Sequence, residues 1–224
     1  MKKILVGLMI ATSAVSFANQ GLNIYGKFGI DAVSRFNKLN DEGETLVKGK
    51  GKVAPAIFLE ATKNVTPDFE AGLGVGYIWR GKENYEFEDS DGKTTGKFPR
   101  YNSVPLYLTG KYNFNLDSEV KPFVKADLGY SFNRAKKFTG TDFNKMPNTT
   151  EDFSEKIKFK NGLYASVGVG FEYRNFVTEL AYVHTTAKIK WDDEDGSDTE
   201  RYNNNALRLT VGYKFNFYLS ENST

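Results

Sequence analysis

The stretch Leu207–Phe217 near the C-terminus alternates apolar and polar residues at every position and closes on the aromatic residues Phe215 and Phe217. A half-buried strand of a soluble sheet usually has about five or six residues, whereas a strand that crosses a bilayer at a tilt needs about nine to eleven. The length of this stretch therefore indicates a membrane-spanning β-strand. Seven stretches upstream alternate in the same way, so we expect eight strands.

Each predicted strand has a row of apolar residues for the lipid and a row of polar or small residues for the interior. The seven upstream strands are predicted to begin near Leu22, Ala56, Phe69, Val104, Val124, Leu163 and Phe176. In the first of them we expect Tyr25, Lys27, Asp31 and Arg35 to face inward. The seventh, residues 176–190, shows the weakest contrast between its two rows.

The N-terminus has the pattern of a secretory signal. Two lysines precede an apolar segment, Ile4–Phe17, and the small residues Ser16 and Ala18 stand where a signal peptidase cleaves. With about fourteen apolar residues the segment is too short to span a bilayer as a helix. We therefore expect a cleaved signal peptide over residues 1–18 and a mature single-domain chain over residues 19–224.

Composition excludes several classes of protein and site. Without Lys2 and Lys3 the mature chain has 28 basic and 28 acidic residues, so no nucleic-acid partner is expected. The chain has no cysteine, which excludes disulfides, and a single histidine leaves no transition-metal cluster. No cofactor is expected either.

The predicted connections alternate in length. Residues 66–68, 115–120 and 174–175 are short, whereas residues 37–52, 81–100, 134–157 and 191–203 are long. Outer-membrane barrels have short periplasmic turns and long extracellular loops. We therefore expect four extracellular loops, and their polar composition without hydrophobic periodicity predicts solvated loops, some of them mobile.

Aromatic residues gather at both ends of the predicted strands. Phe69, Tyr112, Phe114, Phe171, Tyr173, Phe176, Phe215 and Phe217 lie at inner ends, and Phe36, Tyr77, Trp79, Tyr130, Phe132 and Tyr182 at outer ends. Two girdles that flank an aliphatic belt match a bilayer. A secreted β-sandwich also alternates but would not sort its aromatics in this way. The predicted fold is an all-β, eight-stranded, antiparallel, up-and-down transmembrane barrel.

With these features the chain resembles the small outer-membrane barrels of the OmpA/OmpX type, including the Opa, Ail and NspA surface proteins of Gram-negative bacteria. Its last strand carries the most specific likeness, because Thr210, Gly212, Phe215 and Phe217 resemble the signal that the barrel-assembly machinery reads. The tail 218–224 departs from the usual terminal aromatic. The resemblance implies a monomer in the bacterial outer membrane, in contact with lipopolysaccharide.

The predicted interior carries a nearly balanced set of charges. The proposed network consists of Lys27, Asp31, Glu60, Lys111, Asp127 and Arg208. The bore of an eight-stranded barrel is just wide enough for side chains to fill, and buried charges persist when they are paired. We therefore expect a salt-bridged plug, with a gated ion path as the alternative.

Three other motifs have weaker chemical interpretations. His184 lacks a neighbouring serine and an oriented carboxylate, so a lipid A-modifying enzyme is disfavoured and no catalytic residue is assigned. The acidic turns 89–92 and 192–196 resemble calcium loops only in part, because the positions that would begin and end an EF-hand loop are aromatic. Gly72, Gly74 and Gly76 are expected to relieve crowding inside the barrel.

Taken together, the sequence predicts a non-enzymatic surface protein whose loops adhere to a host molecule or bind another partner. The alternative is a small gated channel for ions or apolar solutes. No motif in the loops identifies a ligand.

Overall fold

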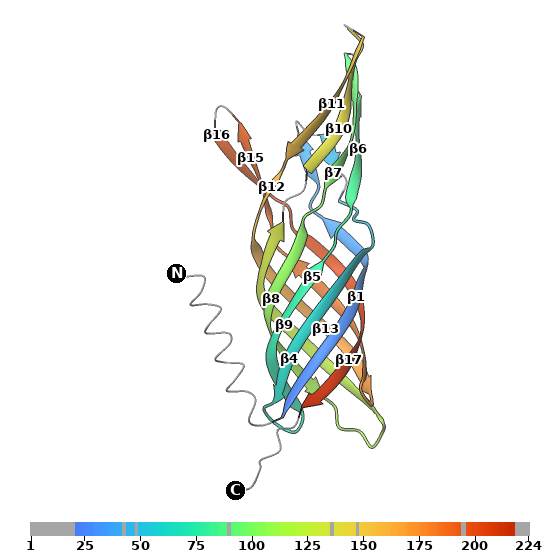
Figure 1. Ribbon diagram of the computed structural model, residues 1–224, viewed down its shortest axis with the longest axis vertical. Coiled ribbons are helices and arrows are strands. Elements are labelled where there is room, and N and C mark those ends of the chain that lie inside the picture. The colour runs from blue at the N-terminus through green and yellow to red at the C-terminus, as the bar shows by residue number, and fades with distance from the viewer. Residues whose placement is uncertain are drawn as a thin grey trace.

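Eight long strands form the body of the molecule, which we describe from a computed structural model over residues 21–41, 44–47, 49–88, 91–134, 137–146, 148–193 and 196–217. They are β1 (Leu22–Phe36), β4 (Ala54–Asn64), β5 (Phe69–Ile78), β8 (Asn102–Asn113), β9 (Val120–Arg134), β13 (Gly162–Tyr173), β14 (Phe176–Thr185) and β17 (Asn204–Phe217). They close into a barrel in the order β1-β17-β14-β13-β9-β8-β5-β4 (Figure 1). All neighbours are antiparallel, which confirms the predicted fold class.

The two ends of the barrel differ. The turns at residues 65–68, 114–119 and 174–175 lie at the end where β1 starts and β17 finishes, which we call the turn end (Figure 1). The long connections leave from the opposite end, which we call the hairpin end. The described residues include no helix of the length and hydrophobicity that a membrane span requires. The predicted signal segment, residues 1–18, lies outside the described residues.

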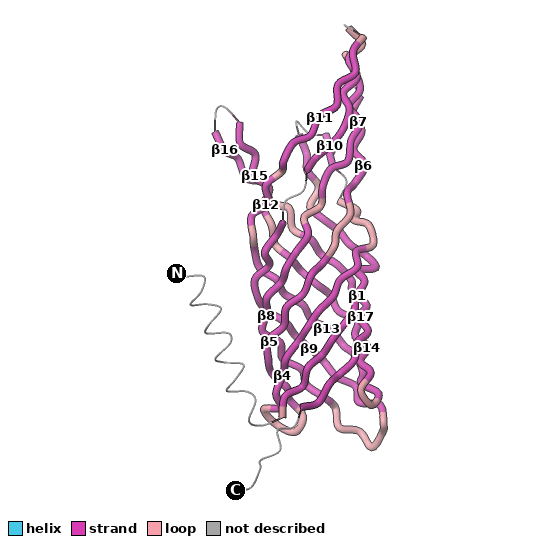
Figure 2. Tube along the Cα trace, in the orientation of Figure 1, coloured by secondary structure: helices cyan, strands magenta, loops and turns pink. Residues whose placement is uncertain are grey.

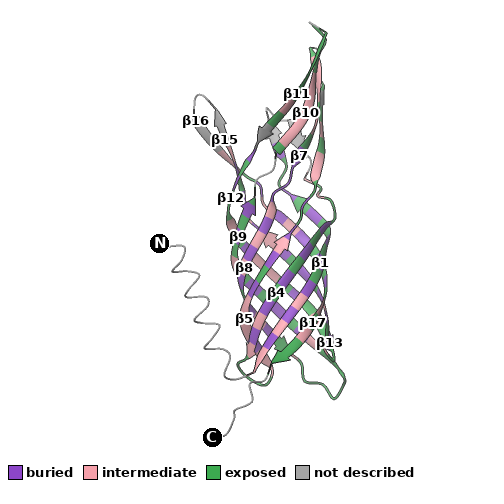
Figure 3. Ribbon diagram, in the orientation of Figure 1, coloured by how far each residue is buried: buried purple, intermediate pink, exposed green. Residues whose placement is uncertain are grey.

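Burial alternates along the strands as the sequence predicts (Figure 3). In β4, Ala56, Phe58 and Glu60 are buried, whereas Ile57 and Leu59 are about half exposed. The same apolar exposure recurs around the outside of the barrel. A belt of exposed leucine, valine and isoleucine side chains is the surface that a bilayer covers.

A β-bulge in β1 breaks this alternation. Strands β1 and β17 pair from Leu22 opposite Phe217 up to Phe36 opposite Asn204, and the register shifts between Asp31 and Val33. A bulge inserts one extra residue, so every side chain beyond it changes face. The prediction that Arg35 faces inward is therefore wrong, because Arg35 is exposed. Phe36 is buried and does not belong to the outer aromatic girdle.

Much of the long connections is strand, which corrects the prediction of solvated loops (Figure 2). The additional strands are β2 (Leu39–Asp41), β3 (Glu44–Val47), β6 (Lys82–Glu88), β7 (Gly92–Pro99), β10 (Lys137–Asn144), β11 (Thr149–Lys156), β12 (Lys158–Lys160), β15 (Lys188–Asp193) and β16 (Gly196–Arg201). They form a four-stranded sheet β11-β10-β7-β6, a three-stranded sheet β12-β15-β16 and the pair β2-β3. The predicted seventh strand, residues 176–190, is interrupted at residues 186–187 between β14 and β15.

Aromatic residues explain why the four-stranded sheet forms. The ring of Phe138 lies 5.7 Å from Tyr85, 5.5 Å from Phe98 and 4.9 Å from Phe153, so four strands share one aromatic face. Gly96 lies opposite Gly140 on the same face and leaves room for these rings. Aromatic cross-strand pairs of this kind stabilise a sheet. The prediction of solvated loops rested on a lack of hydrophobic periodicity, and it missed these aromatic contacts between strands.

Candidate functional site: the barrel interior

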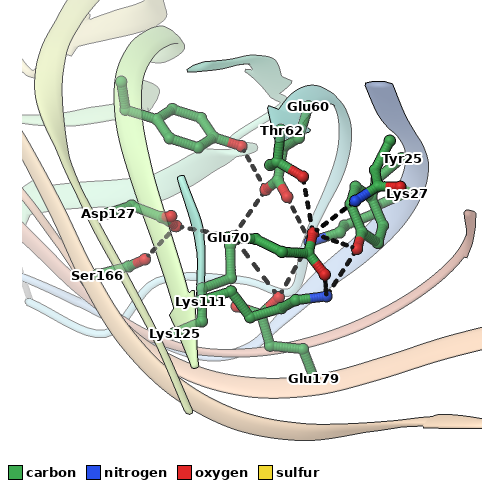
Figure 4. A network of polar contacts seen from close by, with 12 residues as sticks. Tyr25, Lys27, Glu60, Thr62, Glu70, Lys111, Lys125, Asp127, Ser166 and Glu179 are labelled. Carbon is green, nitrogen blue, oxygen red and sulfur yellow. Dashed lines mark hydrogen bonds and ion pairs between the residues drawn. The ribbon is translucent and has the colours of Figure 1, made fainter. Parts of the chain in front are cut away.

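The interior of the barrel holds stacked layers of charged and aromatic side chains. In the layer around Glu60, the carboxylate accepts hydrogen bonds from Lys27 Nζ at 2.6 Å and Lys125 Nζ at 2.7 Å (Figure 4). The hydroxyl of Tyr107 also donates to Glu60, at 2.8 Å. Glu179 lies 3.3 Å from Lys27 Nζ. Lys27 touches two carboxylates and Lys125 touches three, so the layer is a connected ionic network rather than a set of pairs.

Asp127, which lies on β9 with Lys125, also belongs to this layer. It lies 3.1 Å from Lys125 Nζ and accepts a hydrogen bond of 2.6 Å from the Ser166 hydroxyl (Figure 4). Its other oxygen, Oδ1, is buried without a partner in the described structure. Lys125 therefore links the carboxylates of Glu60 and Asp127.

A second layer lies nearer the turn end. Lys111 Nζ donates to the Tyr25 hydroxyl at 2.6 Å, lies 2.9 Å from Glu70 and pairs with Glu172. Lys214 lies 3.1 Å from Glu70 and 3.5 Å from Glu172. The Tyr25 hydroxyl in turn donates to Glu70 at 2.8 Å. Two cations thus share two carboxylates around a central tyrosine.

A buried ion pair between Arg208 and Asp31 lies on the hairpin side of the Glu60 layer. Arg208 Nε donates to Asp31 at 2.6 Å, and its Nη1 donates to the Tyr164 hydroxyl at 3.1 Å. The guanidinium also lies 4.7 Å from the ring centroid of Phe58, a cation–π distance. Asp31 Oδ2 and Arg208 Nη2 are buried without a protein partner among the described residues.

Arg80 occupies the next layer. It donates to the Ser103 hydroxyl at 2.6 Å and to Asn204 Oδ1 at 3.1 Å, and its guanidinium lies 5.0 Å from the ring centroid of Tyr101. Asn204 also donates to the Ser34 hydroxyl at 2.8 Å, which fastens the layer to β1. The contacts of the Arg80 guanidinium described here are with neutral side chains.

An aromatic cap closes the hairpin end of the bore. Its buried members are Phe36, Leu39, Phe98, Tyr101, Ile157, Phe159, Ala187, Ile189 and Tyr202, which come from β1, β2, β7, β12, β15 and the segments between them. Arg100 lies 4.4 Å above the ring centroid of Phe36 and donates to the Tyr202 hydroxyl. Burial lowers the pKa of the Arg100 guanidinium, and the Glu83 carboxylate, 3.9 Å away, opposes this shift.

Sequence reasoning missed this cap, because it assigned Arg100 and the residues around it to solvated loops. The apolar residues next to Arg100, Phe98 and Tyr101, were the available signal. A short apolar stretch in an otherwise polar segment indicates a buried contact. The bulge that turns Phe36 inward had no comparable signal.

The Glu60 layer leaves almost no free space. The hollow among the charged residues of the Glu60 layer has a volume of about 10 Å³, which is the space needed for about one water molecule. A bore filled by side chains is what the size of an eight-stranded barrel requires.

The structure divides the predicted network between layers. Lys27, Glu60 and Asp127 share the Glu60 layer, Asp31 pairs with Arg208, and Lys111 belongs to the layer nearer the turn end. The layers also contain charged residues outside the predicted set of six, namely Lys125, Lys214, Glu70, Glu172 and Glu179. The hydroxyls of Tyr25, Tyr107 and Tyr164 accept or donate hydrogen bonds between the charges.

The four residues of the predicted assembly motif lie on β17. Thr210 is buried, whereas Phe215 and Phe217 are about half exposed on the lipid side. A Cβ atom on Gly212 would lie 2.7 Å from the backbone oxygen of Gly26, so this position requires a glycine for β1 and β17 to approach. The tail 218–224 lies outside the described residues.

The other candidate motifs form no site in the described structure. His184 Nδ1 lies 2.6 Å from Asn205 Oδ1, which the Tyr182 hydroxyl also contacts at 2.9 Å. No group of three histidine, cysteine or acidic residues that could hold a metal ion occurs among the described residues. The acidic turns fall partly on residues 89–90 and 194–195, which lie outside the described residues.

Comparison with known proteins identifies the family. A sequence model of the outer membrane protein beta-barrel domain family matches residues 4–215. The chain belongs to this family. The barrel is therefore a bacterial outer-membrane protein, as the resemblance implied, and its exposed apolar belt is the surface that faces lipid.

Individual relatives agree with this assignment. The barrel is 33% identical to "Uncharacterized protein PM1543" of Pasteurella multocida (strain Pm70) over 96% of this chain and 98% of that protein. It is similar in fold to the outer membrane protein OprG from Pseudomonas aeruginosa, with a TM-score of 0.52, 12% identity and coverage of 90% of this chain and 98% of OprG. The outer membrane protein AlkL matches with a TM-score of 0.50, 13% identity and coverage of 92% and 94%.

Proposed function

We propose that this outer-membrane barrel is a closed scaffold that displays a β-sheet outside the cell for binding a partner. The observation that carries the proposal is the contrast between the two halves of the molecule. The bore is filled by ionic layers and an aromatic cap, while the four-stranded sheet β11-β10-β7-β6 stands beyond the barrel (Figure 1).

The direction of display follows from the lengths of the connections. Barrels of this class place short turns in the periplasm and long connections outside. The hairpin end is therefore the extracellular end in this proposal, and the start of β1 and the end of β17 lie on the periplasmic side.

The displayed sheet has features suited to a protein partner. Strands β6 and β11 are its edges, and an edge strand offers unpaired backbone groups to which a partner can add a strand. At the far end, Phe143 is 38% and Met146 is 92% exposed. Exposed apolar residues at the tip of a displayed sheet can form a contact surface.

An attachment assay tests the proposal. Bacteria that express the protein are applied to a monolayer of cultured epithelial cells and compared with bacteria whose two hairpins, residues 83–98 and 138–155, are each replaced by a short turn. We expect attachment with the wild type and its loss with the shortened protein, provided that both barrels reach the outer membrane in equal amounts. Equal attachment of the two strains would contradict a binding role for the sheet.

A further inference from the structure

A second surface at the hairpin end carries a row of like charges. In the sheet β12-β15-β16, Lys160 lies directly opposite Lys188, and Lys188 lies directly opposite Arg201. All three side chains are exposed. The neighbours Phe159 and Ile189 are buried in the aromatic cap, so alternation turns the three cations to the outer face of the sheet.

This arrangement is unfavourable for the protein alone. Like charges directly opposite each other on adjacent strands destabilise a sheet. Among the described residues, no carboxylate pairs with Lys160, Lys188 or Arg201. By contrast, Lys93 in the four-stranded sheet lies 2.7 Å from Glu86. Within the part of the chain that the structure describes, the positive charge of the row therefore has no counter-ion.

The row lines a groove with additional hydrogen-bond donors. The groove has a volume of about 470 Å³, and Asn161, Thr186 and Asn203 line it beside the three cations. The side-chain oxygens of Asn161 and Asn203 each accept a backbone N–H, at 2.8 Å and 3.1 Å. This fixes each amide so that its Nδ2 group is left to donate. Cations combined with neutral donors suit a phosphate group.

The height of the row relative to the bilayer indicates which molecule supplies the phosphate. Leu163, three residues after Lys160, pairs with Tyr130 of the outer aromatic girdle. At about 3.3 Å per residue, the row lies roughly 10 Å beyond the girdle along the strand. Aromatic girdles mark the level of the lipid headgroups. Strands β15 and β16 also lean away from the barrel (Figure 1), so their outer face is turned toward the surrounding leaflet.

We propose that Lys160, Lys188 and Arg201 form a binding site for the phosphate groups of lipopolysaccharide in the outer leaflet. The site anchors the base of the β15-β16 hairpin to the membrane surface. The site rests on the proposed orientation, in which the hairpin end is extracellular. It is separate from the displayed sheet, so it does not depend on the proposed partner binding.

The test measures binding of purified lipid A to the folded protein in detergent micelles. The two probes are bisphosphorylated lipid A and the same lipid after removal of its phosphates. We expect the wild type to prefer the phosphorylated form by about a hundredfold, since each basic residue near an anionic surface contributes roughly fivefold. The variant K160Q/K188Q/R201Q should lose this preference.

Two control variants test whether the preference for phosphorylated lipid A depends on this site or on the total positive charge of the hairpin end. K160R/K188R/R201K keeps the positive row and should keep the preference. K52Q/K97Q/K137Q removes three exposed cations elsewhere at the hairpin end and should also keep it. If the triple glutamine variant does not fold, as judged by heat-modifiable migration in a gel, K188Q alone replaces it with an expected loss of roughly fivefold.

Two results would overturn the proposal. One is an unchanged preference in K160Q/K188Q/R201Q. The other is binding of soluble heparin by the wild type, without lipid, as tightly as phosphorylated lipid A, because the row would then recognise a soluble polyanion rather than the membrane.

Discussion

At the scale of single residues, the interior depends on glutamates whose carboxylates are each shared by two lysines. Glu60 receives hydrogen bonds from Lys27, Lys125 and Tyr107, all of them buried. A buried ion pair adds little net stability over an apolar core, but removing one partner leaves an uncompensated charge. The network is therefore sensitive to single changes.

Replacing Glu60 by alanine should destabilise the barrel by about 3 to 5 kcal/mol, because Lys27 and Lys125 lose a shared counter-ion. Glu60→Lys should be worse, since three cations would then share the layer. The measurement is the free energy of unfolding in urea, in lipid vesicles. The exposed Lys93–Glu86 pair is the control, and Glu86→Ala should change stability little. Equal effects at Glu60 and Glu86 would show that water reaches the Glu60 layer.

Crowding inside the bore gives a second prediction at this scale. A Cβ atom on Gly74 would lie 2.3 Å from the ring of Tyr107, whereas one on Gly26 would meet nothing within 4 Å. Gly74→Ala should therefore cost roughly 1 to 3 kcal/mol through overpacking, and Gly26→Ala should be tolerated. Urea unfolding of both variants measures the difference, and similar stabilities would contradict the account of crowding at Gly74.

Which residues of a strand face the interior and which face lipid was predictable wherever the strand has no bulge. Alternation alone placed Glu60, Lys111 and Arg208 in the interior, where the structure has them. Arg35 and Phe36 were assigned to the wrong faces because a bulge after Asp31 inserts one residue, and no residue type in this segment requires a bulge.

At the scale of elements, β17 closes the barrel, because it pairs with β1 on one side and with β14 on the other. Its last residue, Phe217, pairs with Leu22 at the turn end. The lipid-facing ring of Phe217 lies where an aromatic girdle meets the headgroups.

Replacing Phe217 by serine should lower the amount of folded protein in the outer membrane, because the strand loses both its aromatic anchor and part of the proposed assembly signal. Heat-modifiable migration of the protein in membrane fractions provides the measurement. Deleting residues 218–224 should have a smaller effect. A deletion as harmful as Phe217→Ser would place the signal in the tail.

The hairpins lead to a prediction about topology. A tag inserted near Asp91, Met146 or Asp195 should be reached by external antibody in intact cells, whereas a tag near Asp68 or Asp117 should not. Met146 lies beyond the end of β10 at Asn144, so a tag there interrupts no strand of the displayed sheet. Antibody access to the Asp68 site in intact cells would reverse the proposed orientation.

These hairpins also mark the limit of prediction for elements. The lengths of the connections were read correctly, but their polar composition suggested solvated loops. The strands form because sparse aromatics such as Tyr85, Phe138 and Phe153 meet across neighbouring strands. Contacts between segments far apart in sequence are absent from the local pattern, so tertiary packing decided their structure.

At the scale of the whole molecule, side chains fill the bore of the barrel in the residues that the structure describes. Ionic layers occupy the bore from the turn end to Arg80, and the aromatic cap with Arg100 closes the hairpin end. The hollow of about 10 Å³ in the Glu60 layer has room for about one water molecule. Strand number, rather than the presence of charge, sets this limit.

Single-channel recording of the mature protein in planar lipid bilayers tests this claim most directly. We expect no large, stable conductance, because paired side chains already fill the bore. Steady ion-selective currents, together with unaltered unfolding of the Glu60 variants, would show that the interior is wet and that the protein is a channel.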